Sequence, residues 1–91
     1  MTETREPFHL HLVSDSTGET IRSVSRACLA QFEDTEVIEH FWPMARTAKA
    51  MNLVLEEISE KPGPVMFTVV NDKLGEQLVR GCRLCQVPCI S

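Results

Sequence analysis

The sequence predicts an α/β fold in which a parallel β-sheet lies between layers of helices. Short apolar runs alternate with stretches of helical periodicity, and short polar connections separate them. The run at residues 65–70 is nearly all apolar, which suits a strand covered on both faces of a parallel sheet. Right-handed crossovers then turn the order β-α-β-α-β-α-β into a three-layer sheet of Rossmann-like or flavodoxin-like architecture.

Residues 8–13 form the first predicted strand, because apolar side chains alternate along them. The polar turn at 14–20 follows, and in it Ser16 and Glu19 fit a capping box that predicts the start of a helix. Residues 33–35 are expected to close that helix. Its inner stripe at helical spacing consists of Ile21, Val24, Cys28, Leu29 and Phe32.

Residues 37–42 form the second predicted strand, which ends at Pro43. A second helix follows, and it carries the most regular apolar stripe in the chain. That stripe consists of Met44, Ala48, Met51, Leu55 and Ile58. The Pro-Gly-Pro sequence at 62–64 forbids further helix and leads into the third strand at 65–70.

Asn71 or Asp72 is predicted to cap the third helix. The inner stripe of this helix consists of Leu74, Leu78, Cys82 and Cys85. A fourth strand begins at Val87 and breaks off at Ser91. Strand orders 2-1-3-4 and 3-2-1-4 both remain open, and we favour 2-1-3-4 because the strongly apolar third strand suits a central place.

The length of 91 residues supports one small domain. Residues 1–7 are polar and of mixed charge, so we expect a disordered lead-in there. Residues 8–91 are predicted to form an α/β domain. Because the last strand begins without anything to cover it, we expect that domain to be the N-terminal part of a longer protein.

The composition argues against several classes of protein. A net charge of −4 disfavours binding to nucleic acid or to an anionic membrane. The apolar runs are too short to span a membrane, and the N-terminal residues do not have the pattern of a signal peptide. These observations predict a cytoplasmic protein whose four cysteines are free thiols.

The polar turn after the first strand is the main candidate site. A strand that ends in a turn containing glycine and enters a helix is how α/β folds bind anions. Its backbone N–H groups and hydroxyls would hold a phosphate or carboxylate, although the two carboxylates would repel one. The candidate ligands are Ser14, Asp15, Ser16, Thr17, Gly18, Glu19 and Thr20. The alternative is a capped helix without a ligand, and the turn contains neither a Walker loop nor a GxGxxG motif.

Polar residues also follow the next two strands, so they are expected at the same edge of the sheet. Arg46 follows the second strand and suits phosphate oxygens or the Asp15 carboxylate, with Thr47 as a weaker candidate. Asn71 and Asp72 follow the third strand, but helix capping alone explains them well.

Two groups of residues raise the question of a metal site. Cys82, Cys85 and Cys89 have ligand-like spacing, but the first two lie on a buried helical stripe and no second Cys pair supplies further ligands. The three histidines, His9, His11 and His40, fall in the middle of strands rather than at the edge of the sheet. We therefore predict partly buried, hydrogen-bonded histidines and no metal.

Three segments together resemble the pyruvate, phosphate dikinase regulatory proteins and their relatives that regulate phosphoenolpyruvate synthase. The first is the run His-Leu-His-Leu-Val-Ser-Asp-Ser-Thr-Gly-Glu-Thr at 9–20. The second is Glu-His-Phe-Trp-Pro at 39–43 with Arg46 and Thr47, and the third is the strand at 67–70 with its polar exit. The resemblance covers nearly all of the chain from Phe8 onward.

This resemblance implies a bifunctional serine/threonine kinase and phosphorylase. Such proteins use ADP to phosphorylate a threonine of the dikinase or synthase, which inactivates that enzyme. They reactivate it with inorganic phosphate and release pyrophosphate. The family's nucleotide-binding P-loop lies in a C-terminal domain that this chain lacks, so no catalytic residue is assigned here and the chain alone is expected to be inactive. That domain and the target enzyme are the implied partners, and a homodimer is left open.

Two other functions remain open from the residues themselves. One is a stand-alone α/β module that binds a phosphorylated metabolite or a nucleotide at the turn. The other is a cysteine-dependent metal protein.

Overall fold

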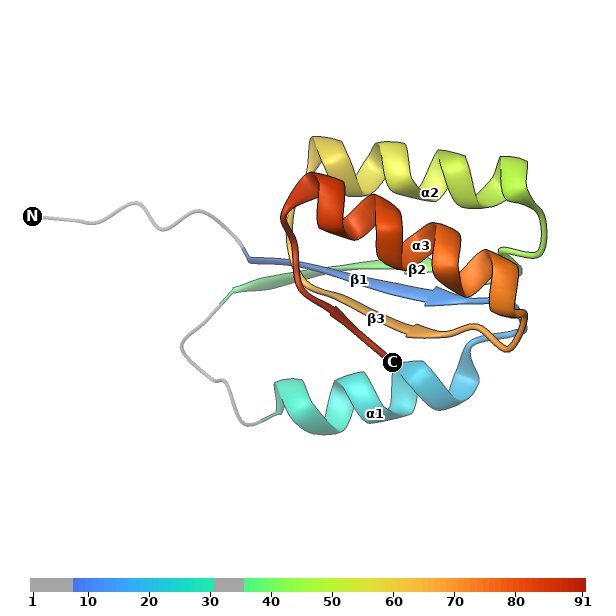
Figure 1. Ribbon diagram of the computed structural model, residues 1–91. Helices are drawn as coiled ribbons and strands as arrows, with labels where there is room; N and C mark the ends of the chain where they lie inside the picture. Colours follow the sequence, from blue (N-terminus) through green and yellow to red (C-terminus); the bar gives the residue numbers. More distant parts are fainter. Residues whose placement is uncertain (1–7, 31–35) are drawn as a thin grey trace, which may run out of the picture.

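The computed structural model describes residues 8–30 and 36–91, and it confirms the predicted order of alternating strands and helices (Figure 1). The elements are β1 (Phe8–Ser14), α1 (Glu19–Leu29), β2 (Val37–Trp42), α2 (Ala48–Glu60), β3 (Val65–Thr68), α3 (Asp72–Cys85) and β4 (Cys89–Ile90). The predicted lead-in at 1–7, Phe32 and the helix-closing residues 33–35 lie outside the described residues.

The strands form one parallel sheet with the order β2-β1-β3-β4, which confirms the strand order that we favoured. In this sheet β1 has a partner on each side, and its residues Leu12 and Val13 are fully buried. The register places His11 opposite His40 on β2 and opposite Val65 on β3. The central strand β1 therefore contributes buried residues to the core, and its carboxyl end leads into the polar turn at 14–20.

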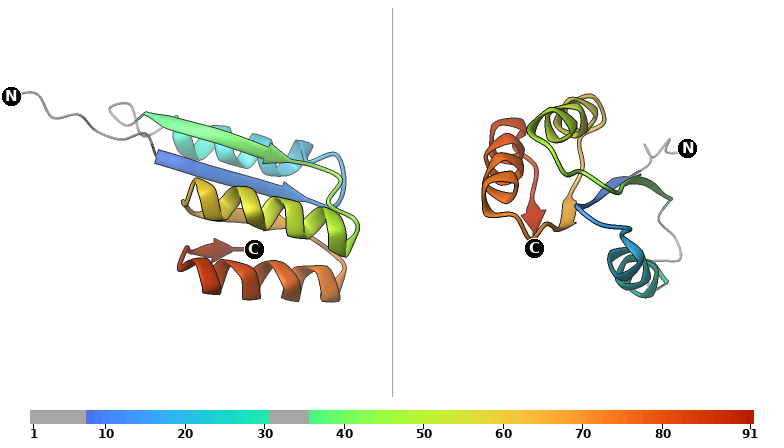
Figure 2. Two further views of the ribbon diagram at one scale, coloured as in Figure 1. Left: turned by 90° about the horizontal axis from the view of Figure 1, so that it is seen from above. Right: turned by 90° about the vertical axis from the view of Figure 1, so that its right-hand side faces the viewer.

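Helices α2 and α3 lie on one face of the sheet and α1 lies on the other (Figures 1 and 2). Because side chains alternate along a strand, the two faces of β1 belong to two cores. Val13 packs with Met51, Ile58 and Leu78 under α2 and α3. On the other face, Leu10, Leu12 and Ile21 pack with half-buried side chains, namely Leu29, Val37, Phe41 and Met66.

The start of α1 differs from the prediction. The predicted capping box of Ser16 and Glu19 is wrong, because the N-cap residue is Gly18 and no side chain caps the helix. This start rotates the helix so that Ile21 and Ser25 are its buried residues, whereas Val24 and Cys28 of the predicted stripe are exposed. Polar Ser25 can be buried there because its hydroxyl donates a 2.8 Å hydrogen bond to Glu39 of β2.

Helix α2 begins later than predicted. Met44 has a left-handed backbone with a φ of 62° and is 47% exposed, so it is not part of the helix. Thr47 is the N-cap, and its hydroxyl accepts a hydrogen bond from the N–H of Ala50. Ala48 is exposed and Leu55 is half-buried, because the buried stripe runs through Met51, Val54 and Ile58.

The third strand is shorter than the predicted 65–70 and is covered mainly on one face. It ends at Thr68, and Val70 beyond it is 86% exposed. Helix α3 begins after Asn71, whose side chain accepts a hydrogen bond from the Leu74 N–H, which confirms the predicted cap. Its buried residues are Leu74, Leu78 and Cys82, whereas Cys85 is half-buried.

Candidate functional site

The carboxyl ends of β1, β2 and β3 meet at one edge of the sheet, as neighbouring parallel strands must. The right-hand view of Figure 2 looks onto this edge. The segments that leave the three strands there are residues 15–18, 43–47 and 69–71. This arrangement brings the predicted turn at 14–20 beside the exits of both neighbouring strands.

Asp15 connects the three exits through its own polar groups. Its backbone N–H donates to the carbonyl of Thr68 at 3.3 Å, and its carboxylate Oδ2 accepts from the N–H of Val70 at 2.8 Å. Its carbonyl oxygen accepts from Nε of Arg46 at 2.9 Å. The Asp15 carboxylate therefore ties β1 to the exit of β3, and its carbonyl holds Arg46 at the turn.

Ser14 and Ser16 shape the inner side of the turn. The Ser14 hydroxyl is buried, accepts from the Ser16 N–H at 3.1 Å and lies 3.2 Å from the Ser16 hydroxyl. The carbonyls of these two serines accept from the N–H groups of Ala45 and Met44, both at 2.9 Å. These bonds fix the turn against the exit of β2 and leave the Ser14 hydroxyl occupied within the turn.

Gly18 sets the direction in which α1 leaves the turn. It has a left-handed backbone with φ 80° and ψ 11°, which glycine adopts at little cost. A Cβ at this position would lie 2.5 Å from Cε1 of Phe41, so the ring packs directly on the glycine. The Gly18 carbonyl accepts from Arg22, the first N–H of α1 with an intrahelical acceptor.

The preceding N–H groups of the first turn, at Glu19, Thr20 and Ile21, have no acceptor within the helix. These three residues belong to the lining of a pocket of about 420 Å³ between the start of α1 and the exit of β3. The pocket is lined by Asp15, Ser16, Thr17, Gly18, Glu19, Thr20, Ile21, Thr68 and Val70. Donor groups and the positive end of the helix dipole make such a place suitable for an anion.

The charges around the turn have both signs. Glu19 lies in the first turn of α1 and is exposed, and Asp15 has one carboxylate oxygen engaged by Val70. Arg46 is held at the same turn, whereas the Arg22 guanidinium lies 4.7 Å from the centre of the Phe41 ring. Arg46 is thus the cation best placed to offset the two carboxylates when an anion binds.

The weaker candidates after β2 and β3 have structural contacts of their own. Thr47 and Asn71 each accept the hydrogen bond of an N-cap, from Ala50 and Leu74. Asn71 and Asp72 line a different pocket of about 460 Å³, beside Arg80 and the exit of β3. The structure therefore places residues 15–20 of the turn at one pocket and Asn71 and Asp72 at another. Ser14 and Arg46 contact the turn but do not line its pocket.

The three histidines form a stacked row with Trp42 on the face of the sheet under α2. Nδ1 of His9 lies 2.8 Å from Nε2 of His40, and the rings of His11 and His40 stack with centroids 4.6 Å apart. Burial lowers the pKa of both His11 and His40. The prediction of partly buried, hydrogen-bonded histidines is confirmed. The contacts of His11 and His40 with Trp42 were not predicted, although alternation along β2 places His40 and Trp42 on the same face.

Cys82 is buried, and burial together with the nearby Cys89 raises the pKa of its thiol to about 12. A buried thiol of this kind stays protonated at neutral pH and packs as a small apolar side chain. Among residues 8–30 and 36–91, no group of three or more His, Cys, Asp or Glu side chains is arranged to hold a metal ion. In the same part of the chain no helix is long and apolar enough to cross a membrane.

Fold and site together define a parallel α/β domain with an anion-compatible turn at the exit of its first strand. The chain belongs to the kinase/pyrophosphorylase family, which it matches over residues 10–91. This finding confirms the family that the sequence motifs resemble.

Similar proteins carry the name "Putative pyruvate, phosphate dikinase regulatory protein". The one from Rhodospirillum rubrum is 48% identical over 86 residues, which are 94% of this chain and 31% of that protein. The one from Sphingopyxis alaskensis is 43% identical over 84 residues, which are 92% of this chain and 31% of that protein. The one from Paramagnetospirillum magneticum is 49% identical over 84 residues, which are 92% of this chain and 27% of that protein. The chain thus spans less than a third of the length of these relatives.

Proposed function

We propose that this chain is the N-terminal part of a bifunctional enzyme that regulates pyruvate, phosphate dikinase or phosphoenolpyruvate synthase in the cytoplasm. The enzyme phosphorylates its target with ADP and removes the phosphate again with inorganic phosphate, releasing pyrophosphate. Membership of the kinase/pyrophosphorylase family and the names of the relatives support this proposal.

Within that enzyme the role of this chain is to bind phosphate at the turn of residues 14–20. The observation that carries this role is the first turn of α1, whose residues line an open pocket and whose N–H groups have no acceptor within the helix. Arg46 adds a cation that is bonded to the Asp15 carbonyl of the same turn. The ligand is inorganic phosphate or the phosphorylated threonine of the target, because both present the same phosphate oxygens. Donors fixed by the bonds of Ser14 and Asp15 would not need to reorganise when phosphate binds.

Phosphoryl transfer also needs a nucleotide cradle, a cationic clamp and a positioned hydroxyl. The sequence carries no GxxxxGK[ST] motif, and the turn of residues 14–20 contains no lysine. We therefore assign binding and orientation to this chain, and ADP binding and catalysis to a P-loop domain elsewhere in the enzyme. The chain by itself is expected to have no kinase activity.

Titration of inorganic phosphate into the chain tests the binding role by NMR. We expect the amide resonances of residues 16–20 to shift in a saturable way as phosphate is added. A chloride salt at the same ionic strength should leave these resonances unchanged. Arg46→Gln should weaken the binding several-fold, because it removes the cation held at the turn. Lys49→Gln is the matched control, since Lys49 is an exposed cation in the first turn of α2, three residues after Arg46. Unmoved resonances in a folded chain would contradict the proposal.

A further inference from the structure

The face of the sheet that carries α1 is only partly covered. In the right-hand view of Figure 2, α2 and α3 lie on one side of the sheet, and α1 lies on the other side, where it contacts β1 and β3. Among residues 8–30 and 36–91, no helix lies beneath β4. In the described part of the chain this face of β4 is therefore open, and β3 is covered only where α1 contacts it.

The open underside is apolar. Val65 is buried under α2 and α3, so the next residue, Met66, faces the opposite side, where it packs with the core around α1. Ile90 is the partner of Met66 in the register and shares its face, yet it is 54% exposed. At the carboxyl end of the same strand pair, Val70 is 86% exposed.

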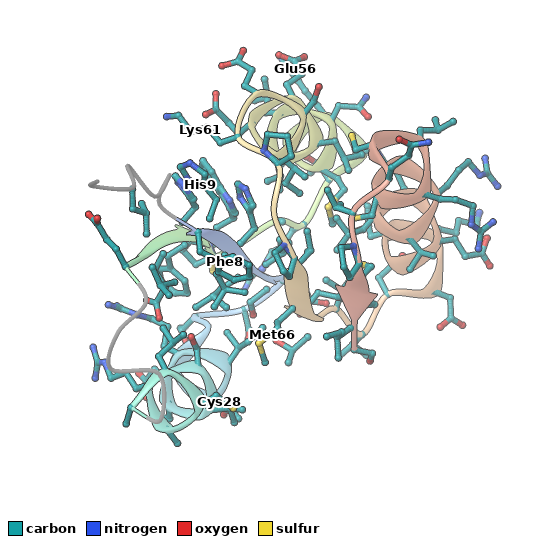
Figure 3. The ribbon with its side chains drawn as sticks, turned by 90° about the vertical axis from the view of Figure 1, so that its left-hand side faces the viewer. Phe8, His9, Cys28, Glu56, Lys61 and Met66 are labelled. Carbon is teal, nitrogen blue, oxygen red and sulfur yellow. The ribbon has the colours of Figure 1, made fainter. Side chains whose placement is uncertain are left out.

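One flank of α1 forms the wall of this open face. Arg22 lies over the Phe41 ring and so marks the side of α1 that faces β2. Val24 follows two residues later, which is about 200° around the helix, and so it faces away from β2 and toward β3. Val24 is 46% exposed, and Cys28 one turn further on is exposed as well. Figure 3 shows Cys28 on the side of α1 nearer to Met66.

We propose that this open face, formed by Val24, Cys28, Met66 and Ile90, is an intramolecular docking surface. Its occupant is an amphipathic segment from the remainder of the full-length protein, which in the relatives makes up more than two thirds of the length. The four side chains carry no charge, so they suit an apolar partner and offer nothing to attract a charged one.

The topology favours a segment of the same chain. The connections from β2 to β3 and from β3 to β4 place α2 and α3 on one face, because right-handed crossovers in one direction use one face. The connection from β1 to β2 runs in the opposite direction and places α1 on the other face. A crossover helix of the same chain that covers β4 beside α1 would therefore run in the direction from β4 toward β2, as α1 does.

The open face ends at the candidate phosphate pocket, because Thr68 and Val70 belong to the lining of that pocket. A segment docked beside α1 would consequently form one wall of the pocket. This consequence rests on the proposed phosphate binding, whereas the docking surface itself does not.

Cys28 is a natural probe of the docking surface. We would compare its rate of alkylation by a maleimide, located by mass spectrometry, in the 91-residue chain and in the full-length protein that carries this sequence. The proposal predicts alkylation about tenfold or more slower in the full-length protein, since a docked segment must open first. A Leu84→Cys variant is the control, because Leu84 is 81% exposed on α3, on the opposite face, and should react alike in both proteins.

Equal rates at Cys28 in the two proteins would overturn the proposal. Protection of Cys28 in the 91-residue chain that increases with its concentration would also overturn it, because a second copy would then be the occupant. Val24→Glu supplies an independent test. It should lower the melting temperature of the full-length protein by several degrees but leave that of the 91-residue chain nearly unchanged. The matched variant Leu84→Glu should have little effect in either protein, and equal effects of the two variants would count against the docking surface.

Discussion

The indole N–H of Trp42 donates a hydrogen bond to Nδ1 of His11 across the β1–β2 pair, at 3.1 Å. Because an indole N–H is only a donor, Nδ1 of His11 cannot carry a proton in this arrangement. The other ring nitrogen, Nε2, lies 2.8 Å from the carbonyl oxygen of Lys61, which can only accept. These two contacts hold the fully buried His11 as the neutral tautomer with its proton on Nε2.

We expect the free energy of unfolding to fall as the pH falls below about 6.5. Burial lowers the pKa of His11 and of His40 below the ordinary value of 6.5, and the neighbouring histidines and the charge of Lys61 act in the same direction. The hydrogen bond of His11 to the Lys61 carbonyl and the charge of Glu57 oppose this lowering of the pKa but do not reverse it. The unfolded chain therefore takes up protons before the folded chain does. The stabilisation is complete above the unfolded pKa and is lost as the pH falls through the lowered folded values.

Urea denaturation at about pH 7.5, 6.5 and 5.5 measures this dependence. Trp42→Phe is the informative variant, because it keeps an aromatic ring in the stack but removes the donor that requires a neutral His11. The loss of stability between the two lower pH values should be smaller in this variant. A midpoint that stays constant over the whole range in the unaltered chain would contradict the expectation.

Gly18→Ala should destabilise the fold by about 1–3 kcal/mol. The alanine would have to adopt a φ of 80°, and its Cβ would lie 2.5 Å from the Phe41 ring. Gly75→Ala is the matched control, since Gly75 lies within α3 and a Cβ there would meet nothing within 4 Å. That substitution should stabilise the chain by up to about 1 kcal/mol through helix propensity. Chemical denaturation of both variants gives the comparison, and equal effects would show that the Gly18 backbone is not required.

The sequence predicted what depends on local pattern. The alternation along β1, the limits of β2 and the Asn71 cap follow from nearby residues, and the structure confirms them. The rotation of α1 could not be predicted in this way. Gly18 packs on Phe41 of a different strand, and the buried Ser25 is satisfied by Glu39, so hydrophobic periodicity assigned the wrong stripe.

In the candidate site, too, the local features were predicted from the sequence and the contacts between distant segments were not. The residues of the turn at 14–20 are contiguous, and their exit from a central strand is visible in the sequence. The contacts of Asp15 with Thr68, Val70 and Arg46 depend on which strands are neighbours, and the sequence left two strand orders open. The left-handed Met44, whose N–H bonds to Ser16, likewise belongs to a contact between two exits rather than to a helical stripe.

Asp15 separates the structural role of the turn from its electrostatic role. Asp15→Ala removes the acceptor of the Val70 N–H and should cost about 0.5–1.5 kcal/mol of stability, because that bond is exposed at the surface. Asp15→Asn keeps an oxygen acceptor but removes the negative charge beside the pocket. It should retain nearly all of the stability and bind inorganic phosphate several-fold more tightly, because a nearby carboxylate repels the anion. Denaturation and phosphate titration of both variants test this pair of expectations. If the Asn variant bound phosphate more weakly than the unaltered chain, the Asp15 carboxylate would have to take part in binding rather than oppose it.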